Sequence, residues 1–428
     1  MNQFGNYLGR GISGDAFSGA ERSTLVLGPS RSGKTSCLII PNLLMTEHGA
    51  VTTSTKNDVV RIIASARTDV AHLLFDPSGT VPVPPGVIAV GFSPITLAST
   101  WDGSLLVTRS LSDTQQTMRS AHGDDHWTER SSALLAPLLH AAALNGTSLG
   151  KFARSVDERR GEASLEILRA TYGDTHQSVA LLSGILSTEQ RELSGIWSNA
   201  SGLLNGLRTD AAQMASRRPE LDVDEFIKRK AQLHIVAPSR YQAITSPLVV
   251  GLIDQVVHQT YGVHHEGHRL LLALDELANV APLPQLPSII SEGGGQGVTT
   301  LAALQDLSQA RRRWGVSGDS FLSLFPTAII FPGIADRPTL DLLAGLGGRI
   351  ATPTPTHSLS RRGKFQGVSW SHPELARATV ADIAQGRPGM ALGVTPDKHM
   401  QWIGLTPYYR GDRFVRYRDR STSRDRSR

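Results

Sequence analysis

Short apolar runs alternate with helix-length segments over the first quarter of the chain. Residues 36–45 have the apolar content of a helix, interrupted by Pro41. Runs of strand length occupy residues 23–27, 49–53, 72–75 and 87–90. Apolar strands separated by helical segments are typical of a parallel sheet. The pattern therefore predicts an α/β fold.

The pattern changes near Ser112. From there to about residue 230, β-branched runs give way to leucines at helical spacing, such as Leu134, Leu135, Leu138 and Leu139. Leucines three and four residues apart lie on one face of a helix. We therefore expect residues 112–230 to form an all-helical insertion. Strand signals resume at residues 232–236, 270–274, 298–302 and 328–331, so the sheet is completed after the insertion.

The last eighty residues have a different composition. Residues 350–372 are rich in Thr, Ser, Pro and Arg, which predicts a loop. Residues 410–428 hold eight Arg and three Asp, which accounts for the whole formal net charge of +5. Such a tail cannot bury enough apolar surface to fold, so we expect it to be disordered. It would either contact nucleic acid or an acidic membrane face, or act as a solvated tail.

The bulk composition adds few constraints. The 428 residues are 40% hydrophobic and 19% charged, which is ordinary for a soluble globular enzyme of two or three domains. The most apolar stretches have strand length, whereas a membrane-spanning helix needs about 20 consecutive apolar residues. We therefore expect no membrane span of its own and a cytoplasmic location. The single cysteine, Cys37, excludes an intrachain disulfide.

Residues 28–35, GPSRSGKT, fit the phosphate-binding pattern G-x-x-x-x-G-K-[ST] directly after an apolar strand. We call them the P-loop. The glycines let backbone N–H groups curl around phosphate oxygens, and the next helix points its positive dipole end at them. Lys34 is expected to reach the β- and γ-phosphates, and Thr35 to place a hydroxyl on Mg²⁺. The predicted contacts of ATP are Gly28, Pro29, Ser30, Arg31, Ser32, Gly33, Lys34, Thr35 and Ser36.

Two carboxylates follow the strand-like run at residues 270–274. Asp275, at the carboxyl end of a buried strand beside the P-loop strand, would hold Mg²⁺ together with Thr35. The adjacent Glu276 would polarise the attacking water. An acidic pair alone is a weak signal, but its position after an apolar strand in a chain with a P-loop makes it specific.

Gln305 ends a further strand pattern at residues 299–304. A polar side chain at the carboxyl tip of such a strand faces the ligand crevice of an open α/β sheet. Gln305 would therefore sense the γ-phosphate; the other reading is a helix-capping or solvent-facing glutamine. With Lys34 and Glu276 it completes the predicted set of catalytic residues.

The predicted organisation has five parts. A short lead is followed by a nucleotide-binding domain in two halves, with the helical insertion between them and the basic tail at the end. The corresponding boundaries are residues 1–20, 21–111, 112–230, 231–408 and 409–428.

The order of these motifs resembles a known family. The P-loop is followed by IPNLL at residues 40–44, FDP at residues 75–77, the helical insertion, and a stretch at residues 275–315 that begins DELANV and ends QARRRWG. Over roughly residues 20–350 this is similar to the conjugative coupling-protein ATPases of type IV secretion systems. These TraG/TraD-like proteins belong to the FtsK/HerA superfamily of DNA translocases.

The resemblance implies a hexameric RecA-like ring with an all-helical domain at its cytoplasmic mouth. ATP hydrolysis at subunit interfaces would drive single-stranded DNA, with a bound relaxase of the relaxosome, towards the secretion channel subunits. By the same resemblance, Lys34 and Thr35 take the Walker A roles, Asp275 and Glu276 the Walker B roles, and Gln305 that of the third motif.

The sequence departs from the family pattern in three places. Coupling proteins usually begin with transmembrane helices, so another subunit would anchor this chain peripherally at the inner face of the membrane, or it would work as a soluble motor. Residues 292–298 lack the arginine that often reaches the neighbouring subunit's nucleotide. Its candidate substitutes are Arg311, Arg312, Arg313 and Arg337. The strand before Lys56 ends in Ser54, where the family usually has an Asp.

Three other functions remain open from the sequence. One is a soluble ring ATPase that moves duplex DNA or protein. Another is an assembly protein that binds ATP as a structural switch and hydrolyses it poorly. The third is a small-molecule P-loop kinase, for which residues 112–230 make a poor lid.

Overall fold

The computed structural model describes residues 5–119, 125–218, 220–351, 354–359, 365–371, 374–397, 399–415 and 417. Within these residues the chain is organised around one twelve-stranded sheet, with the strand order β2-β1-β16-β15-β10-β3-β9-β8-β4-β7-β5-β6. The strands are β1 (Tyr7–Gly11), β2 (Gly14–Phe17), β3 (Thr24–Leu27), β4 (Gly49–Ser54), β5 (His72–Phe75), β6 (Val87–Ala89), β7 (Gln232–Val236), β8 (Leu270–Leu274), β9 (Val298–Leu304), β10 (Thr327–Ile330), β15 (Met390–Val394) and β16 (Met400–Gly404).

The sheet is parallel from β10 to β6 and antiparallel from β15 to β2. The central strands are largely apolar, and β3, β4, β7, β8, β9 and β10 are buried along their whole length. Strands of a parallel sheet need this composition because helices cover both of their faces. The predicted α/β fold is confirmed.

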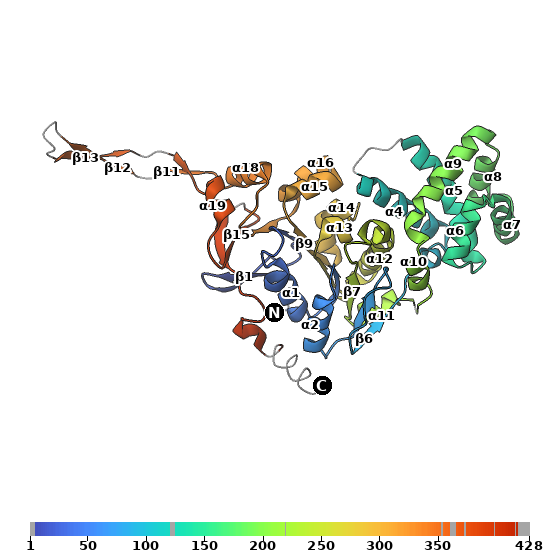
Figure 1. The fold of residues 1–428 in the computed structure, drawn as a ribbon, viewed down its shortest axis with the longest axis horizontal. Coiled ribbons are helices and arrows are strands. Elements are labelled where there is room, and N and C mark those ends of the chain that lie inside the picture. The colour runs from blue at the N-terminus through green and yellow to red at the C-terminus, as the bar shows by residue number, and fades with distance from the viewer. Residues whose placement is uncertain are drawn as a thin grey trace.

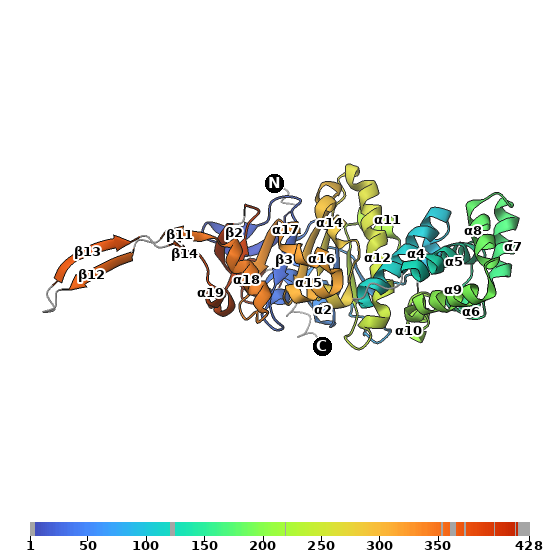
Figure 2. The same ribbon diagram turned by 90° about the horizontal axis from the view of Figure 1, so that it is seen from above.

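The P-loop strand shows how the two faces are covered. Leu25 and Leu27 belong to one hydrophobic cluster, whereas Val26 between them belongs to another. Helical segments η1 (Thr35–Ile39), α1 (Ile40–Met45) and α2 (Asp58–Ala66) cover the face of Val26. The opposite face carries α12 (Gln242–Val263), α13 (Leu277–Val280), α14 (Leu286–Glu292), α15 (Leu307–Trp314), α16 (Val316–Asp319) and α17 (Phe321–Leu324), as Figures 1 and 2 show.

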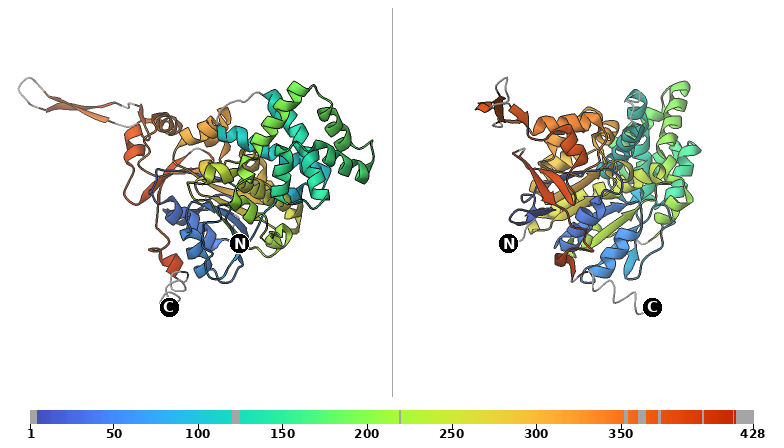
Figure 3. Two further views of the ribbon diagram at one scale, coloured as in Figure 1. Left: turned by 45° about the vertical axis from the view of Figure 1, so that its right-hand side comes forward. Right: turned by 60° about the vertical axis from the view of Figure 1, so that its left-hand side comes forward.

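A lobe of helices projects from the β6 end of the sheet (Figures 1 and 3). It contains α4 (Trp101–Arg119), α5 (Asp125–Leu144), α6 (Leu149–Asp157), α7 (Gly161–Tyr172), α8 (Gln177–Leu186), α9 (Gln190–Leu203) and α10 (Asp210–Ala215), preceded by α3 (Pro94–Leu97). The next helix, α11 (Val223–Lys228), packs on the body against α12 and β4. Residue 112, the predicted start of the insertion, lies inside α4. The helical pattern begins earlier because Val107 and Leu111, one turn apart, are both buried in the core.

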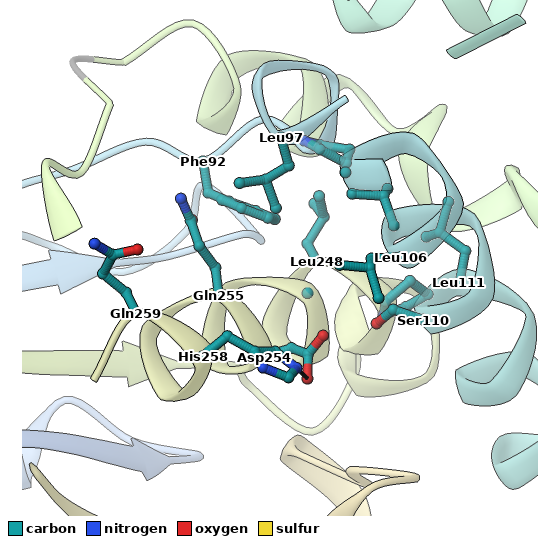
Figure 4. A pocket seen from close by; sticks show the side chains of 15 residues that line it. Phe92, Leu97, Leu106, Ser110, Leu111, Leu248, Asp254, Gln255, His258 and Gln259 are labelled. Carbon is teal, nitrogen blue, oxygen red and sulfur yellow. Dashed lines mark ion pairs between the residues drawn. The ribbon is translucent and has the colours of Figure 1, made fainter. Parts of the chain in front are cut away.

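The junction between this lobe and the sheet contains a pocket of about 210 Å³. Apolar side chains of α4 and α12 form most of its wall, and Asp254, Gln255 and His258 of α12 line its polar side (Figure 4). Burial raises the pKa of Asp254, and His258 Nε2 lies 3.5 Å from its carboxylate. The long helix α12 therefore joins the two parts through a largely apolar contact.

Residues 350–372, predicted as a loop, contain paired strands. β11 (Arg349–Ala351) pairs with β14 (Glu374–Ala376), and β12 (Thr354–Leu359) pairs with β13 (Phe365–Ser371). The hairpin β12–β13 extends away from the body at the end opposite the helical lobe (Figure 2). It lies beyond α18 (Arg337–Leu346) and α19 (Val380–Gln385). The loop prediction was wrong because Thr and Ser, which favour turns locally, also fit extended strands.

The predicted disordered tail needs a correction at its start. Phe414 and Tyr417 are buried, and the ring of Phe414 lies 6.1 Å from the ring of Tyr7 in an edge-to-face contact. Residues 409–415 and 417 thus include aromatic anchors that dock on β1, whereas residues 418–428 lie outside the described residues. None of the helices in the described ranges is long and apolar enough to cross a bilayer.

Candidate functional site

The P-loop follows β3 and bends back on itself through two left-handed residues. Arg31 has φ = 64° and Gly33 has φ = 100°. The Gly28 N–H donates to Leu304 O at 3.1 Å, which ties the start of the loop to the end of β9. A Cβ on Gly28 would lie 2.6 Å from the Phe331 Cβ, so this position requires glycine. The backbone is therefore shaped as a phosphate cradle before any ligand binds.

The helix after the P-loop starts with a π-helical turn. The Ile40 N–H reaches back to Thr35 O, five residues earlier. Pro41 has no N–H to continue a regular α-helical ladder, which favours this local widening. The wide turn carries Thr35 and Ser36, two of the predicted contacts of ATP.

Lys34 is buried and is held by the loop itself. Its Nζ donates to Gly28 O and, at 2.9 Å, to Pro29 O. Burial lowers the pKa of Lys34, while the carboxylates of Asp275 and Glu276 raise it and so oppose this effect. The ammonium group therefore lies near both predicted acidic residues, in a place where further negative charge is favoured.

Asp275 meets Thr35 across the sheet. Thr35 Oγ1 donates to Asp275 Oδ2 at 2.6 Å. The expectation that the Asp275 strand lies beside the P-loop strand was wrong, because β9 lies between β8 and β3. Burial raises the pKa of Asp275, so the carboxylate is poorly solvated. A poorly solvated carboxylate beside a hydroxyl is a favourable position for a divalent cation.

Glu276 occupies a strained position between β8 and α13. Its backbone is left-handed, with φ = 53° and ψ = 41°, which is uncommon for a residue with a side chain. The turn is supported from the next strand, since Thr53 Oγ1 of β4 donates to Asp275 O at 2.7 Å. Such strain is often retained where it aims a functional side chain.

Gln305 lies at the carboxyl end of β9, between the P-loop strand and the strand of Asp275. Its N–H donates to the side-chain oxygen of Gln309 at 2.9 Å, which turns the chain into α15. The order β3-β9-β8 brings the residues after each strand to the same edge of the sheet. The predicted Walker A, Walker B and third-motif residues thus share one edge.

Two contacts that support the site were not predicted from the sequence. Thr53, described above, belongs to a strand with no motif, and its only signal was a hydroxyl at a strand end. Tyr408 N–H donates to Ser36 O at 2.9 Å, so the C-terminal segment supports the helix after the P-loop. The sequence gives no signal for the second contact, because it joins residues 372 positions apart through the backbone.

The donor set fits a magnesium nucleotide. Among the described residues, no group of three or more His, Cys, Asp and Glu side chains could form a metal cage. Mg²⁺ does not need one, because it usually keeps waters and binds one or two carboxylates together with substrate phosphates. Thr35 and Asp275 supply the hydroxyl and carboxylate oxygens that such a site would use.

The candidate trans arginines differ in their local contacts. Arg311 pairs with Asp336 at 2.7 Å, and Arg337 pairs with Asp341 at 2.9 Å. Burial lowers the pKa of Arg313. Arg312 is exposed on α15 and forms no hydrogen bond or ion pair within the described part of the chain.

This geometry can be compared with known proteins. A sequence model for the family described as type IV secretory system conjugative DNA transfer matches residues 3–380. The chain belongs to this family. It is therefore a relative of the conjugative coupling proteins, as the order of its motifs predicted.

Two curated relatives are conjugal transfer proteins TraG of Escherichia coli. They are 24% identical to this chain over 325 and 319 residues. The matches cover 69% and 68% of this chain but 50% and 49% of the TraG proteins. The chain thus spans about half the length of the curated relatives it matches.

Solved coupling proteins share its fold. The bacterial conjugative coupling protein TrwBdeltaN70, in an unbound form, has a TM-score of 0.65 at 17% identity and covers 90% of this chain and 85% of its own. TrwB in complex with ADP and Mg²⁺ has a TM-score of 0.65 at 18% identity and covers 92% and 87%. The RecA-like P-loop fold with a helical domain, expected from the motifs, is confirmed.

Proposed function

We propose that this chain is a coupling-protein ATPase that hydrolyses ATP with Mg²⁺ to deliver single-stranded DNA to a type IV secretion channel. The observation that carries the proposal is the meeting of Thr35 and Asp275 at 2.6 Å, with the buried Lys34 and the strained Glu276 beside them. The family and the nucleotide-bound TrwB structures support it.

Each residue has a defined task in this proposal. Lys34 exchanges its bonds to the loop carbonyls for the β- and γ-phosphates. Thr35 and Asp275 hold the magnesium ion, which neutralises charge on the phosphates when bound. Glu276 orients and polarises the water that attacks the γ-phosphate, and Gln305 reports whether that phosphate is present. P-loop residues Gly28 to Ser36 position the nucleotide through backbone N–H groups.

The proposed activity requires several copies of the chain. Subunits form a homo-hexameric ring, and an arginine of the next subunit stabilises the transition state, a task for which Arg312 is available. The ring bore contacts DNA phosphates, and the helical domain faces the relaxase and other relaxosome proteins. Channel subunits would hold the ring peripherally at the inner face of the membrane.

The test is the steady-state ATPase rate against protein concentration, with and without single-stranded DNA. A rate per subunit that rises with concentration and with DNA supports an interface-catalysed DNA motor. Stimulation by duplex DNA or by protein instead would assign the motor another substrate. A low, flat rate that ignores DNA would favour an ATP-dependent structural switch and contradict the proposal.

A further inference from the structure

The helical lobe contains a second hollow that the ATPase mechanism does not use. A pocket of about 560 Å³ lies between the start of α6 and the α10 segment, and we call it the basic pocket. Its lining residues are Ser148, Gly150, Lys151, Ala153, Arg154, Asp157, Arg208, Gln213 and Arg217. A Cβ on Gly150 would lie 2.6 Å from Gln213 Oε1, so the missing side chain lets the two elements approach closely.

The basic pocket concentrates positive charge in a segment that is not basic overall. Residues 112–230 contain fourteen Lys and Arg against sixteen Asp and Glu. The lining of the pocket, by contrast, holds four basic residues and one acidic residue. The clustering is therefore a property of this surface and not of the composition of the domain.

One of these cations is already fully engaged. Arg208 donates to both oxygens of Asp157, to Ser201 O at 2.7 Å and to Asn205 Oδ1 at 2.9 Å. The hydrogen bond from Arg208 is the main reason that the pKa of Asp157 lies below its ordinary value. Arg208 and the ionised Asp157 thus brace the wall of the pocket, and they leave its remaining positive charge unbalanced.

The other three cations have no partner within the described residues. Lys151, Arg154 and Arg217 are exposed and form no hydrogen bond or ion pair there. Lys151 and Arg154 lie three residues apart on α6 and share one face, while Arg217 approaches from the α10 side. Ser148 does not cap the first turn of α6, so backbone N–H groups add partial positive charge. Like charges gathered in one hollow repel until an anion binds.

We propose that the basic pocket binds a carboxylate-rich segment of a partner protein. Guanidinium groups match carboxylates with paired donors. The lining has no aromatic ring, whereas sites for single-stranded DNA combine positive charge with aromatic stacking. The oxygens of Asp157, whose charge Arg208 balances, can also accept N–H groups of a peptide backbone, which a sugar–phosphate backbone lacks. This deepens the proposed function, because it names the chemistry by which the helical domain recognises a protein.

The test measures binding of a fluorescein-labelled Glu/Ser repeat peptide to the full chain by fluorescence anisotropy, at low salt and without nucleotide. The Gln/Ser peptide of the same length is the uncharged control. We expect saturable binding of the Glu/Ser peptide only, and weakening by about tenfold or more in Arg154→Glu. The double variant Lys151→Ala/Arg217→Ala should weaken it without reversing any charge. Arg191→Glu, on the exposed side of α9, is the matched control and should bind like wild type.

Three other outcomes contradict the proposal. Equal binding by Arg154→Glu and wild type would place the peptide elsewhere on the chain. Absence of binding to folded wild type would show that the basic pocket does not bind a carboxylate-rich segment. Tighter binding of a labelled single-stranded oligonucleotide, lost in the same variants, would make the pocket a phosphate site. Because no nucleotide is present, peptide binding holds or fails independently of ATP hydrolysis. Loss of ATPase activity with peptide binding intact would contradict only the proposed function.

Discussion

Thr35 donates a hydrogen bond to Asp275 at 2.6 Å, although the two residues are 240 positions apart and β9 separates their strands. The contact exists because β3 and β8 run parallel and end at the same edge of the sheet. Burial disfavours the charge on Asp275, and the Thr35 hydroxyl compensates it only in part. A bound divalent cation would compensate it more completely.

The first prediction concerns this pair. Asp275→Asn keeps an acceptor for Thr35 but removes the charge that attracts Mg²⁺. We expect ATP affinity without Mg²⁺ to stay unchanged and the gain in affinity on adding Mg²⁺ to fall by about 10–100-fold. Binding of a fluorescent ATP analogue, titrated with and without Mg²⁺, measures both. Asp102→Asn on α4 is the control, and an unchanged Mg²⁺ effect in Asp275→Asn would remove Asp275 from the metal site.

The second prediction separates binding from turnover. Glu276→Gln keeps the shape of the side chain but cannot polarise water as a carboxylate does. We expect ATP binding within a few-fold of wild type and a turnover rate lower by about 10²–10⁴-fold. Steady-state phosphate release measures the rate, and Glu266→Gln, before β8, serves as the control. Turnover of Glu276→Gln at the wild-type rate would show that another group orients the water.

The third prediction concerns the backbone of Glu276. A left-handed conformation costs a residue with a side chain about 1–2 kcal/mol, a penalty that glycine avoids. After allowing for the greater freedom of glycine in the unfolded chain, Glu276→Gly should raise the free energy of unfolding by about 0.5–1 kcal/mol while abolishing turnover. Chemical denaturation measures the change. Glu166→Gly in the middle of α7 should do the opposite, and destabilisation by both variants would mean that the strain is not real.

The fourth prediction tests whether an arginine acts between subunits. Arg312→Ala should lower turnover by about 10³-fold or more, because a trans arginine stabilises charge in the transition state. Mixing Arg312→Ala with Glu276→Gln should restore part of the activity, since a Glu276→Gln subunit still supplies Arg312 to its neighbour's intact site. A mixture no faster than its components would rule out this arrangement. Loss of activity in Arg337→Ala instead would assign the task to Arg337.

The sequence was informative wherever local pattern and motif coincide. β3, β5 and β8 are short and mostly apolar, and β4 begins with an apolar run, so their strands were predictable. β1 and β2 were not, because glycines interrupt them and because β1, on which β2 pairs, is itself stabilised by β16, almost 400 residues away. Pairing over such a distance leaves no local trace.

The functional site likewise has features that the sequence predicts and features that it does not. The P-loop and the acidic pair were predictable because phosphate and magnesium chemistry restricts their residue types. The strand β9 was predictable, but its position between β3 and β8 was not, because the order of parallel strands depends on how crossovers pack. The left-handed Glu276 gave no signal, and the support from Thr53 gave only a hydroxyl at a strand end, since both arise from tertiary contacts.

Within the sheet, His72 of β5 and His234 of the neighbouring strand β7 form a buried pair with one consistent proton arrangement. His72 Nε2 lies 2.8 Å from Arg67 O and must donate to it. His72 Nδ1 therefore accepts from His234 Nε2, at 3.2 Å. This leaves His234 Nδ1 unprotonated, and it has no hydrogen-bond partner within the described residues. Protonating either ring would bury a charge, and protonating His72 Nδ1 would also remove the acceptor for His234 Nε2–H.

The fifth prediction follows from this pair. Burial lowers the pKa of His234 from 6.5 to about 3, and it also lowers that of His72. Between pH 6.5 and about pH 3 the unfolded chain binds more protons at these histidines than the folded chain does. The stabilisation that the neutral pair contributes is therefore fully present above pH 6.5. As the pH drops below that value, the free energy of unfolding falls by up to about 1.4 kcal/mol per pH unit per histidine. His234→Gln should make the free energy of unfolding depend less on pH over this range. His265→Gln, on an exposed turn, should leave the pH dependence unchanged. Glutamine keeps a donor for His72 but cannot take up a proton. An equally steep profile in His234→Gln would therefore mean that other groups set the acid sensitivity.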